Sequence, residues 1–402
     1  MRPGGESYDL AVVGGGSAGL AAAVTAARGG ARTLLIERYG YLGGMGTTSL
    51  VHTFCGLYLL REQPGAVLAN LGFPEEMATR MIAATGIGPI RMGRVDVLPQ
   101  HPVEFVRIAD EMVTAEANLE VRFHSKVTAL AREDSGWRIL IGGRAKVESV
   151  NASRLIDASG DAVVADLLGG GTEMADAPRL QRPAYVFGVH CDAVLDDAFR
   201  LQTAGRIVEG IKAGEVPAAA MGITFRASGR KSEIFASLDL DGGETVADFA
   251  PLDPVCLTQL EICGRKTASA VMRWLSSRSE AWRGAYISQW PVRAGIRESR
   301  RWIGESVLTG NHLLAGERFS DEIALATWPM EFREDAKGPK LRYPRENRPA
   351  GIPLGCLRPL GIEHLWVAGR CISADHEAQA SIRVMGTCFA TGEAAAHAAL
   401  RG

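Results

Sequence analysis

The seven cysteines of this chain form no Cys-x-x-Cys pair, and the two closest, Cys256 and Cys263, have six residues between them. This spacing argues against an iron–sulfur cluster, a structural zinc or a redox-active dithiol, so we expect no metal site. Scattered thiols of this kind are typical of buried side chains in a protein from a reducing compartment.

The chain also lacks an excess of charge and a long apolar segment. Its formal net charge is −2, which gives no reason to expect nucleic acid or an anionic membrane as a partner. No apolar run reaches the roughly 18 residues of a membrane-spanning helix, and the first residues do not resemble a signal peptide. We therefore expect a cytoplasmic protein. The sequence leaves open whether it forms a homo-oligomer.

A glycine-rich turn near the start is the most informative feature that is present. Gly14, Gly16 and Gly19 have the spacing Gly-x-Gly-x-x-Gly and follow the apolar residues 10–13, which predict a buried parallel strand. The first glycine permits a tight turn, the second lets backbone N–H groups approach a diphosphate, and the third lets helix and strand pack closely. The alanine-rich residues 17–28 predict the helix whose N-terminus faces the phosphates.

An acidic residue and a second glycine-rich segment then indicate which dinucleotide binds. Glu37 comes 18 residues after Gly19, where a carboxylate binds a ribose 2′-hydroxyl. Four glycines follow within residues 40–46; a nicotinamide site does not need them, whereas the longer FAD crosses the chain a second time. These features predict FAD as the cofactor. The contacts expected from both segments are Gly14, Gly16, Ser17, Ala18, Gly19, Glu37, Arg38, Gly43, Gly44, Met45 and Thr47.

Here the sequence resembles the FAD-dependent oxidoreductases of the glutathione-reductase-like flavoprotein superfamily, which carry two dinucleotide-binding motifs and have Glu-Arg-x-x-x-Leu-Gly-Gly after the second strand. Residues 155–161 are similar to that superfamily's late strand, residues 365–373 to its final strand, and residues 383–387 to the start of its C-terminal helix. The resemblance implies that these segments also border FAD and that the backbone near residue 127 meets the adenine. The further contacts it implies are Val127, Ala158, Ser159, Gly160, Asp161, Gly369, Arg370, Arg383, Val384 and Met385.

The motifs at both ends of the chain predict an α/β fold with a discontinuous FAD-binding domain. We expect this Rossmann-like domain to comprise residues 1–171 and 351–402, with an excursion at residues 63–98. Residues 172–350 carry no dinucleotide signature and predict an inserted α+β substrate or cap domain, built on a mixed antiparallel sheet.

Three side chains are candidates for chemistry at the flavin. His376 stands between the final strand and the final helix and is the first acid–base candidate; a histidine that only hydrogen-bonds the backbone is the alternative. His52 follows the glycine-rich segment and is the second candidate, as a base or a covalent tether. Arg297 would share a helix face with Arg301, and it either holds an anionic substrate or joins the two domains through salt bridges.

These features favour an FAD-dependent oxidoreductase that transfers a hydride between a small organic substrate and the flavin. Oxygen or another acceptor, such as a carrier protein, would reoxidise the flavin. A second Gly-x-Gly-x-x-Gly motif for NAD(P)H is missing. Two alternatives stay open: an NAD(P)H-dependent flavin monooxygenase, and an electron-transfer flavin subunit of a larger complex.

Overall fold

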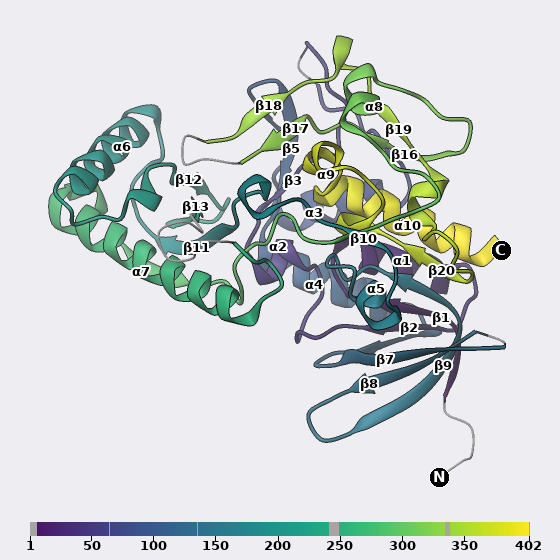
Figure 1. Ribbon diagram of the computed structural model, residues 1–402. Helices are drawn as coiled ribbons and strands as arrows, with labels where there is room; N and C mark the ends of the chain where they lie inside the picture. Colours follow the sequence, from purple (N-terminus) through teal and green to yellow (C-terminus); the bar gives the residue numbers. More distant parts are fainter. Residues whose placement is uncertain (1–5, 64, 135, 241–248, 334–337, 402) are drawn as a thin grey trace.

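The computed structural model describes residues 6–63, 65–134, 136–240, 249–333 and 338–401 (Figure 1). Residues 1–5, on which part of the leader prediction falls, and residue 64 of the predicted excursion lie outside this part. The α-helices are α1 Ser17–Arg28, α2 Met45–Thr48, α3 Phe73–Thr85, α4 Pro102–Thr114, α5 Val163–Leu168, α6 Asp197–Lys212, α7 Pro254–Arg278, α8 Gly310–Ala315, α9 His376–Ile382 and α10 Met385–Arg401. The strands are β1 Ser7–Val13, β2 Thr33–Ile36, β3 Thr53–Phe54, β4 Ile90–Met92, β5 Val95–Pro99, β6 Leu119–Arg122, β7 Lys126–Glu133, β8 Gly136–Gly142, β9 Val147–Asp157, β10 Thr172–Glu173, β11 Ala184–His190, β12 Thr224–Ala227, β13 Glu233–Asp239, β14 Tyr286–Gln289, β15 Arg301–Trp302, β16 Glu322–Ala326, β17 Met330–Phe332, β18 Lys340–Arg342, β19 Ala350–Pro353 and β20 Leu365–Val367.

A seven-stranded sheet forms the centre of the larger unit. Its order is β6-β2-β1-β9-β8-β7, and β20 also pairs with β9. β1 runs parallel to both of its neighbours, β2 and β9. In this register Leu10 lies opposite Thr33 of β2 and Arg154 of β9. Parallel pairing buries both faces of a strand, which is why β1 and β2 read as nearly continuous apolar runs.

Helices α1 and α10, from the two ends of the chain, pack on each other beside this sheet (Figure 1). They approach so closely that a Cβ atom added at Gly392 would lie 2.1 Å from the carbonyl oxygen of Ala18. The contact joins the first βαβ unit to the segment that follows β20. The sheet and these helices therefore confirm the expected α/β class with a Rossmann-like unit.

Two strands of this sheet have pairings that the local sequence does not reveal. β9 is one long strand, which pairs antiparallel with β8 in its first half and parallel with β1 in its second. β6 directly precedes β7 and β8 in the chain but pairs parallel with β2 at the edge of the main sheet. In both cases pairing between distant segments decides the structure, and the local residue pattern does not show it.

The second unit is a four-stranded sheet in the order β12-β13-β11-β14, with antiparallel pairing throughout. The long helices α6 and α7 lie on its outer side, to the left in Figure 1. Its own apolar core includes Phe187 and Trp282, both completely buried. This arrangement matches the expected α+β unit.

Packing of the core indicates where the second unit ends. Its apolar cluster runs from Tyr185 to Ile296, whereas Trp302, Met330 and Ile352 belong to the core of the larger unit. We therefore propose a boundary near residue 300 in place of the expected residue 350. The excursion at residues 63–98 contains α3, and β4 and β5 form a small sheet with β3.

None of the helices in the described residues combines the length and the apolar character that crossing a membrane requires.

Candidate cofactor site

A cavity lies where β1, β2 and β9 end, at the carboxyl edge of the parallel strands. Ligands of open α/β sheets bind at this edge. Segments far apart in the sequence line it: Val13, Gly14, Gly16, Ser17, Ala18, Ile36, Glu37, Arg38, Tyr39, Gly44, Met45, Ser125, Lys126, Val127, Ala158, Ser159, Gly160, Val163, Arg293, Gly369, Arg370, Arg383, Met385 and Cys388.

The turn between β1 and α1 depends on Gly14 within it and on Gly19 in the first part of the helix. Gly14 has φ +97°, and a Cβ atom there would lie 2.8 Å from the Ala158 carbonyl oxygen. A Cβ atom at Gly19 would lie 1.8 Å from the carbonyl oxygen of Gly14. Gly16 is the N-cap of α1 and has no side chain to cap it. The turn is therefore tight, and the N-terminus of α1 is left for a phosphate ligand.

Glu37 lies at the end of β2 and is 6% exposed. Its Oε2 accepts a hydrogen bond from the Gly15 N–H at 2.6 Å, and its Oε1 accepts one from the Tyr39 N–H at 2.8 Å. These two bonds fix the carboxylate at the cavity wall. A carboxylate has further lone pairs, so the position fits a ribose hydroxyl.

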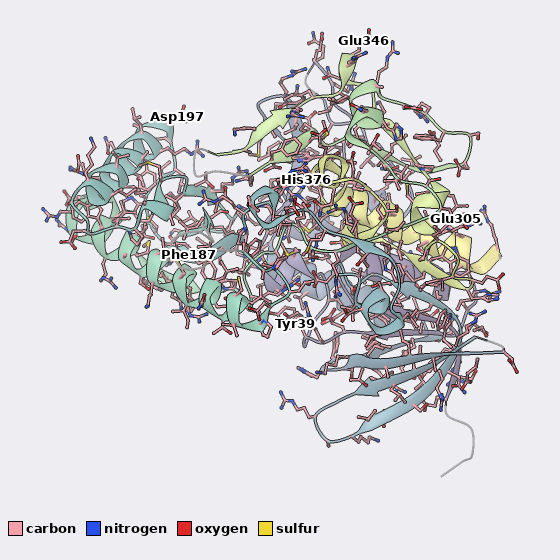
Figure 2. All side chains as sticks on the ribbon, in the orientation of Figure 1. Tyr39, Phe187, Asp197, Glu305, Glu346 and His376 are labelled. Carbon is pink, nitrogen blue, oxygen red and sulfur yellow. The ribbon has the colours of Figure 1, made fainter. Side chains whose placement is uncertain are left out.

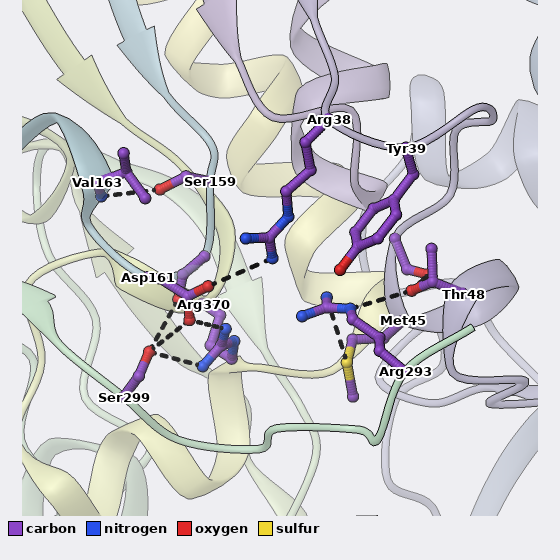
Figure 3. A network of polar contacts seen from close by, with 12 residues as sticks. Arg38, Tyr39, Met45, Thr48, Ser159, Asp161, Val163, Arg293, Ser299 and Arg370 are labelled. Carbon is purple, nitrogen blue, oxygen red and sulfur yellow. Dashed lines mark hydrogen bonds and ion pairs between the residues drawn. The ribbon is translucent and has the colours of Figure 1, made fainter. Parts of the chain in front are cut away.

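Basic side chains surround Asp161 beside the cavity (Figure 3). Arg370 Nη2 lies 2.6 Å from Asp161 Oδ1, and Arg38 Nη2 lies 3.7 Å from Oδ2. The Ser299 hydroxyl donates to Asp161 at 2.8 Å. Burial raises the pKa of Asp161, but Arg370, then Arg293 and the Ser299 hydroxyl, outweigh it and lower the pKa to about 2. Asp161 is therefore ionised at neutral pH.

The residues present fit FAD. A glycine cradle that a single Cβ would fill, an uncapped helix N-terminus and an excess of guanidinium groups suit the diphosphate, and Glu37 suits the ribose. Most of the predicted contacts line the cavity, and the exceptions are Gly19, Gly43, Thr47, Asp161 and Val384.

The exceptions support the wall from behind. Gly19 packs on the turn, and a Cβ at Gly43 would lie 2.5 Å from a methyl carbon of Thr47. The Thr47 hydroxyl donates to the Leu42 carbonyl at 2.7 Å. Val384 packs against residue 56, and Asp161 holds the two arginines. Direct contact of these five with the cofactor stays a prediction.

His376 does not line the cavity. It is buried near the centre of the molecule (Figure 2), and its Nδ1 lies 2.8 Å from Glu298 Oε1. The same oxygen accepts a hydrogen bond from Arg301 Nη1 at 2.9 Å, and Glu298 is completely buried. The ring is thus part of a buried ion-pair network, which favours a structural role. Its acid–base role stays a prediction without support from this geometry.

His52 is also buried away from the cavity. Its ring stacks on Phe235 with centroids 4.9 Å apart, and its Nδ1 lies 3.2 Å from the Leu50 carbonyl oxygen. Burial, with the nearby Arg226, lowers the pKa of His52 to about 4. The neutral ring packs between the two units, and this position gives no support to a covalent tether.

Arg297 joins parts of the chain instead of facing the cavity. The segment around it is not helical, so Arg297 and Arg301 do not share a helix face as expected. Arg297 donates to the Arg182 carbonyl and lies 2.7 Å from Asp239 Oδ1, while Arg333 lies 2.6 Å from Oδ2. These contacts favour the second expectation for Arg297, a salt bridge between parts of the chain, over the binding of an anionic substrate.

Several lining residues were not predicted: Val13, Ile36, Tyr39, Ser125, Lys126, Val163, Arg293 and Cys388. Most are sequence neighbours of predicted contacts, and a wider window around the motifs would have found them. Arg293 is different because it belongs to the second unit and to no dinucleotide motif. The sequence carried no signal for it.

The turn, the ribose carboxylate and the segment around Met385 together define a flavoprotein with a dinucleotide-binding fold. A family model described as FAD dependent oxidoreductase matches residues 9–401. The chain therefore belongs to this family of FAD-dependent oxidoreductases.

Individual relatives are more distant. The chain is 34% identical over 101 residues to the uncharacterized protein Rv0897c of Mycobacterium tuberculosis, a match that covers 23% of this chain and 18% of that protein. The chain thus spans less than a fifth of this curated relative's length. Two solved structures are a geranylgeranyl bacteriochlorophyll reductase-like protein from Thermoplasma acidophilum (12% identity, TM-score 0.47, 99% of this chain and 78% of that one) and the anhydrotetracycline hydroxylase OxyS from Streptomyces rimosus (16% identity, TM-score 0.45, 75% and 54%).

Proposed function

We propose that this oxidoreductase transfers a hydride between a small organic substrate and FAD, and that oxygen or another acceptor then reoxidises the flavin. The observation that carries the proposal is that the glycine turn, Glu37, Gly369, Arg383 and Met385 line one and the same cavity. Bound FAD supplies the two-electron chemistry. The protein's task is to hold it, to exclude water and to stabilise charge.

Different residues of the cavity would bind different parts of FAD. The N-terminus of α1 and the glycine turn hold the diphosphate, Glu37 holds the ribose, and the backbone at Val127 borders the adenine. At the other end Arg383 and the first turn of α10 place positive charge near the ring. Burial lowers the pKa of Arg383, although the negative charge of Glu331 raises it in part.

The substrate side of the ring is the face toward the second unit. Between the units, Leu50 packs with Ala184, Val186 and Phe235 of the second sheet in a small buried apolar cluster that does not itself line the cavity. Such apolar packing near a site excludes water, which strengthens electrostatic interactions there. We propose that a small molecule enters between these two units and that the protein is cytoplasmic.

Anaerobic mixing of the yellow holoenzyme with amines, alcohols and acids tests the reaction. The proposal expects at least one substrate class to bleach the flavin band, and readmitted oxygen or an added acceptor to restore it. Rapid bleaching by NADPH without any substrate would instead identify a monooxygenase. A requirement for a co-purifying electron-transfer protein would identify a subunit of a larger complex.

A further inference from the structure

Arg293 brings a cation from the second unit into the cofactor cavity. It follows β14, and its backbone N–H and that of Val292 donate to the Thr48 carbonyl at 3.2 and 2.8 Å. Its Nε donates to the Thr48 hydroxyl at 3.2 Å, and its guanidinium lies 5.6 Å from the centre of the Tyr39 ring. Figure 3 shows the side chain between Tyr39 and Met45. Contacts with Tyr39 and Thr48 of the larger unit thus fix the position of Arg293.

Arg293 has no carboxylate within ion-pair distance among the described residues. Other arginines of the same segment do: Arg297 is paired with Asp239, and Arg301 with Glu298. A half-buried guanidinium without an anion is costly because it loses hydration without compensation. Its position therefore calls for an anion that the described side chains do not supply.

The charges of the cavity indicate which anion this is. Arg38, Arg370 and Arg293 surround a single carboxylate, Asp161, so the group carries an excess of two positive charges. Glu37 lines the cavity, whereas Asp161 does not, and the oxygens of Glu37 accept two backbone N–H groups. The diphosphate of FAD carries two negative charges. Lys126 and Arg383 line the same cavity and more than offset Glu37, so the cavity as a whole favours an anion such as the diphosphate.

We propose that Arg293 binds the diphosphate of FAD, so that the second unit takes part in holding the cofactor. The inference rests on the proposed location of FAD in this cavity. A guanidinium suits the task because its planar fork donates two parallel hydrogen bonds to phosphate oxygens. Since Arg293 is anchored to Thr48 from the other unit, bound FAD would link both units through one side chain.

Binding to the apoprotein tests the proposal with three probes: FAD, ADP and riboflavin. ADP carries the diphosphate without the ring, and riboflavin carries the ring without the diphosphate. Arg293→Gln is expected to weaken both FAD and ADP by roughly 10- to 100-fold, which is the usual range for a lost charged hydrogen bond. Riboflavin affinity should change by less than about twofold.

Arg293→Lys keeps the charge but loses the fork, and it should weaken FAD and ADP less than the glutamine variant does. The matched control is Arg283→Gln, an arginine of the same unit whose side chain is 75% exposed. It should bind all three probes as the unaltered protein does. If Arg293→Gln fails to fold, the lysine variant supplies the comparison, with a smaller loss for FAD and ADP alone.

Two results would overturn the proposal. Equal ADP affinity with weaker FAD or riboflavin would place Arg293 at the ring or at a substrate carboxylate. Unchanged affinity for all three probes would leave Arg293 without a role in binding. A failure of the cofactor location itself looks different, because ADP and FAD would then not compete in the unaltered protein.

Discussion

Replacing Gly19 by alanine tests the geometry of the glycine turn most directly. The added Cβ would lie 1.8 Å from the Gly14 carbonyl oxygen, which is 1.6 Å short of an ordinary contact of 3.4 Å. Neither atom can give way alone, because one belongs to helix α1 and the other to the turn that it packs on. Either the helix or the turn must move by more than an ångström.

The size of the effect follows from that displacement. Overpacking a well-packed site by one methyl group costs typically about 1–3 kcal/mol, and a clash with backbone belongs at the upper end. The same shift moves the N–H groups of the turn away from the diphosphate. We expect FAD to bind at least 100-fold more weakly, about 2.7 kcal/mol, in Gly19→Ala.

Fluorescence titration of the apoprotein with FAD measures the affinity, and urea unfolding measures the stability. Gly88→Ala is the matched control, since a Cβ there meets nothing within 4 Å and its φ is ordinary. The control should bind FAD normally. Normal FAD affinity in Gly19→Ala would refute the reasoning, because the turn would then tolerate the side chain that the geometry forbids.

Two further predictions concern the buried network and the second histidine. Glu298→Gln leaves the buried Arg301 without its anion, so the free energy of unfolding in urea should fall by about 3–5 kcal/mol. The control is Glu305→Gln at an exposed position, which should change the free energy of unfolding by less than about 0.5 kcal/mol. Equal free energies of unfolding for the two variants would contradict this prediction. The pKa of His52 is lowered from 6.5 to about 4 in the folded protein. As the pH falls, the unfolded chain therefore takes up the proton before the folded protein does. The stability that this residue contributes above pH 6.5 is lost between pH 6.5 and pH 4. This residue should account for a loss of about 3 kcal/mol across that range, at about 1.4 per pKa unit. Unfolding curves at several pH values should show a smaller loss in His52→Phe, which keeps the ring stack on Phe235; parallel curves for both proteins would count against it.

The features predicted well from the sequence are those that a short stretch of backbone determines. A turn at Gly14 with positive φ leaves its signature in glycine spacing, and Glu37 must follow at the end of the next strand. The FAD cofactor, the fold class and most residues of the cavity wall follow from such local constraints.

The features missed depend on contacts between distant segments. His376 is where the sequence analysis expected it, between β20 and α10, but its partner Glu298 comes from another part of the chain. Arg297 pairs with Asp239 of β13, and Arg293 reaches the cavity only because β14 joins the second sheet. No local pattern records which arginine faces a ligand and which faces a carboxylate.

The order in which the ribosome makes these segments has a consequence for cofactor loading. β1, α1 and β2 emerge early, whereas β20 and α10, which complete the sheet and the cavity wall, are made only after the whole second unit. Domains generally fold as their chain emerges, but here the early segment must wait. A nascent chain halted before β20 would present a glycine turn with no opposite wall. We therefore expect flavin to bind only after synthesis is nearly complete, and a chain that ends before β20 to be purified without colour.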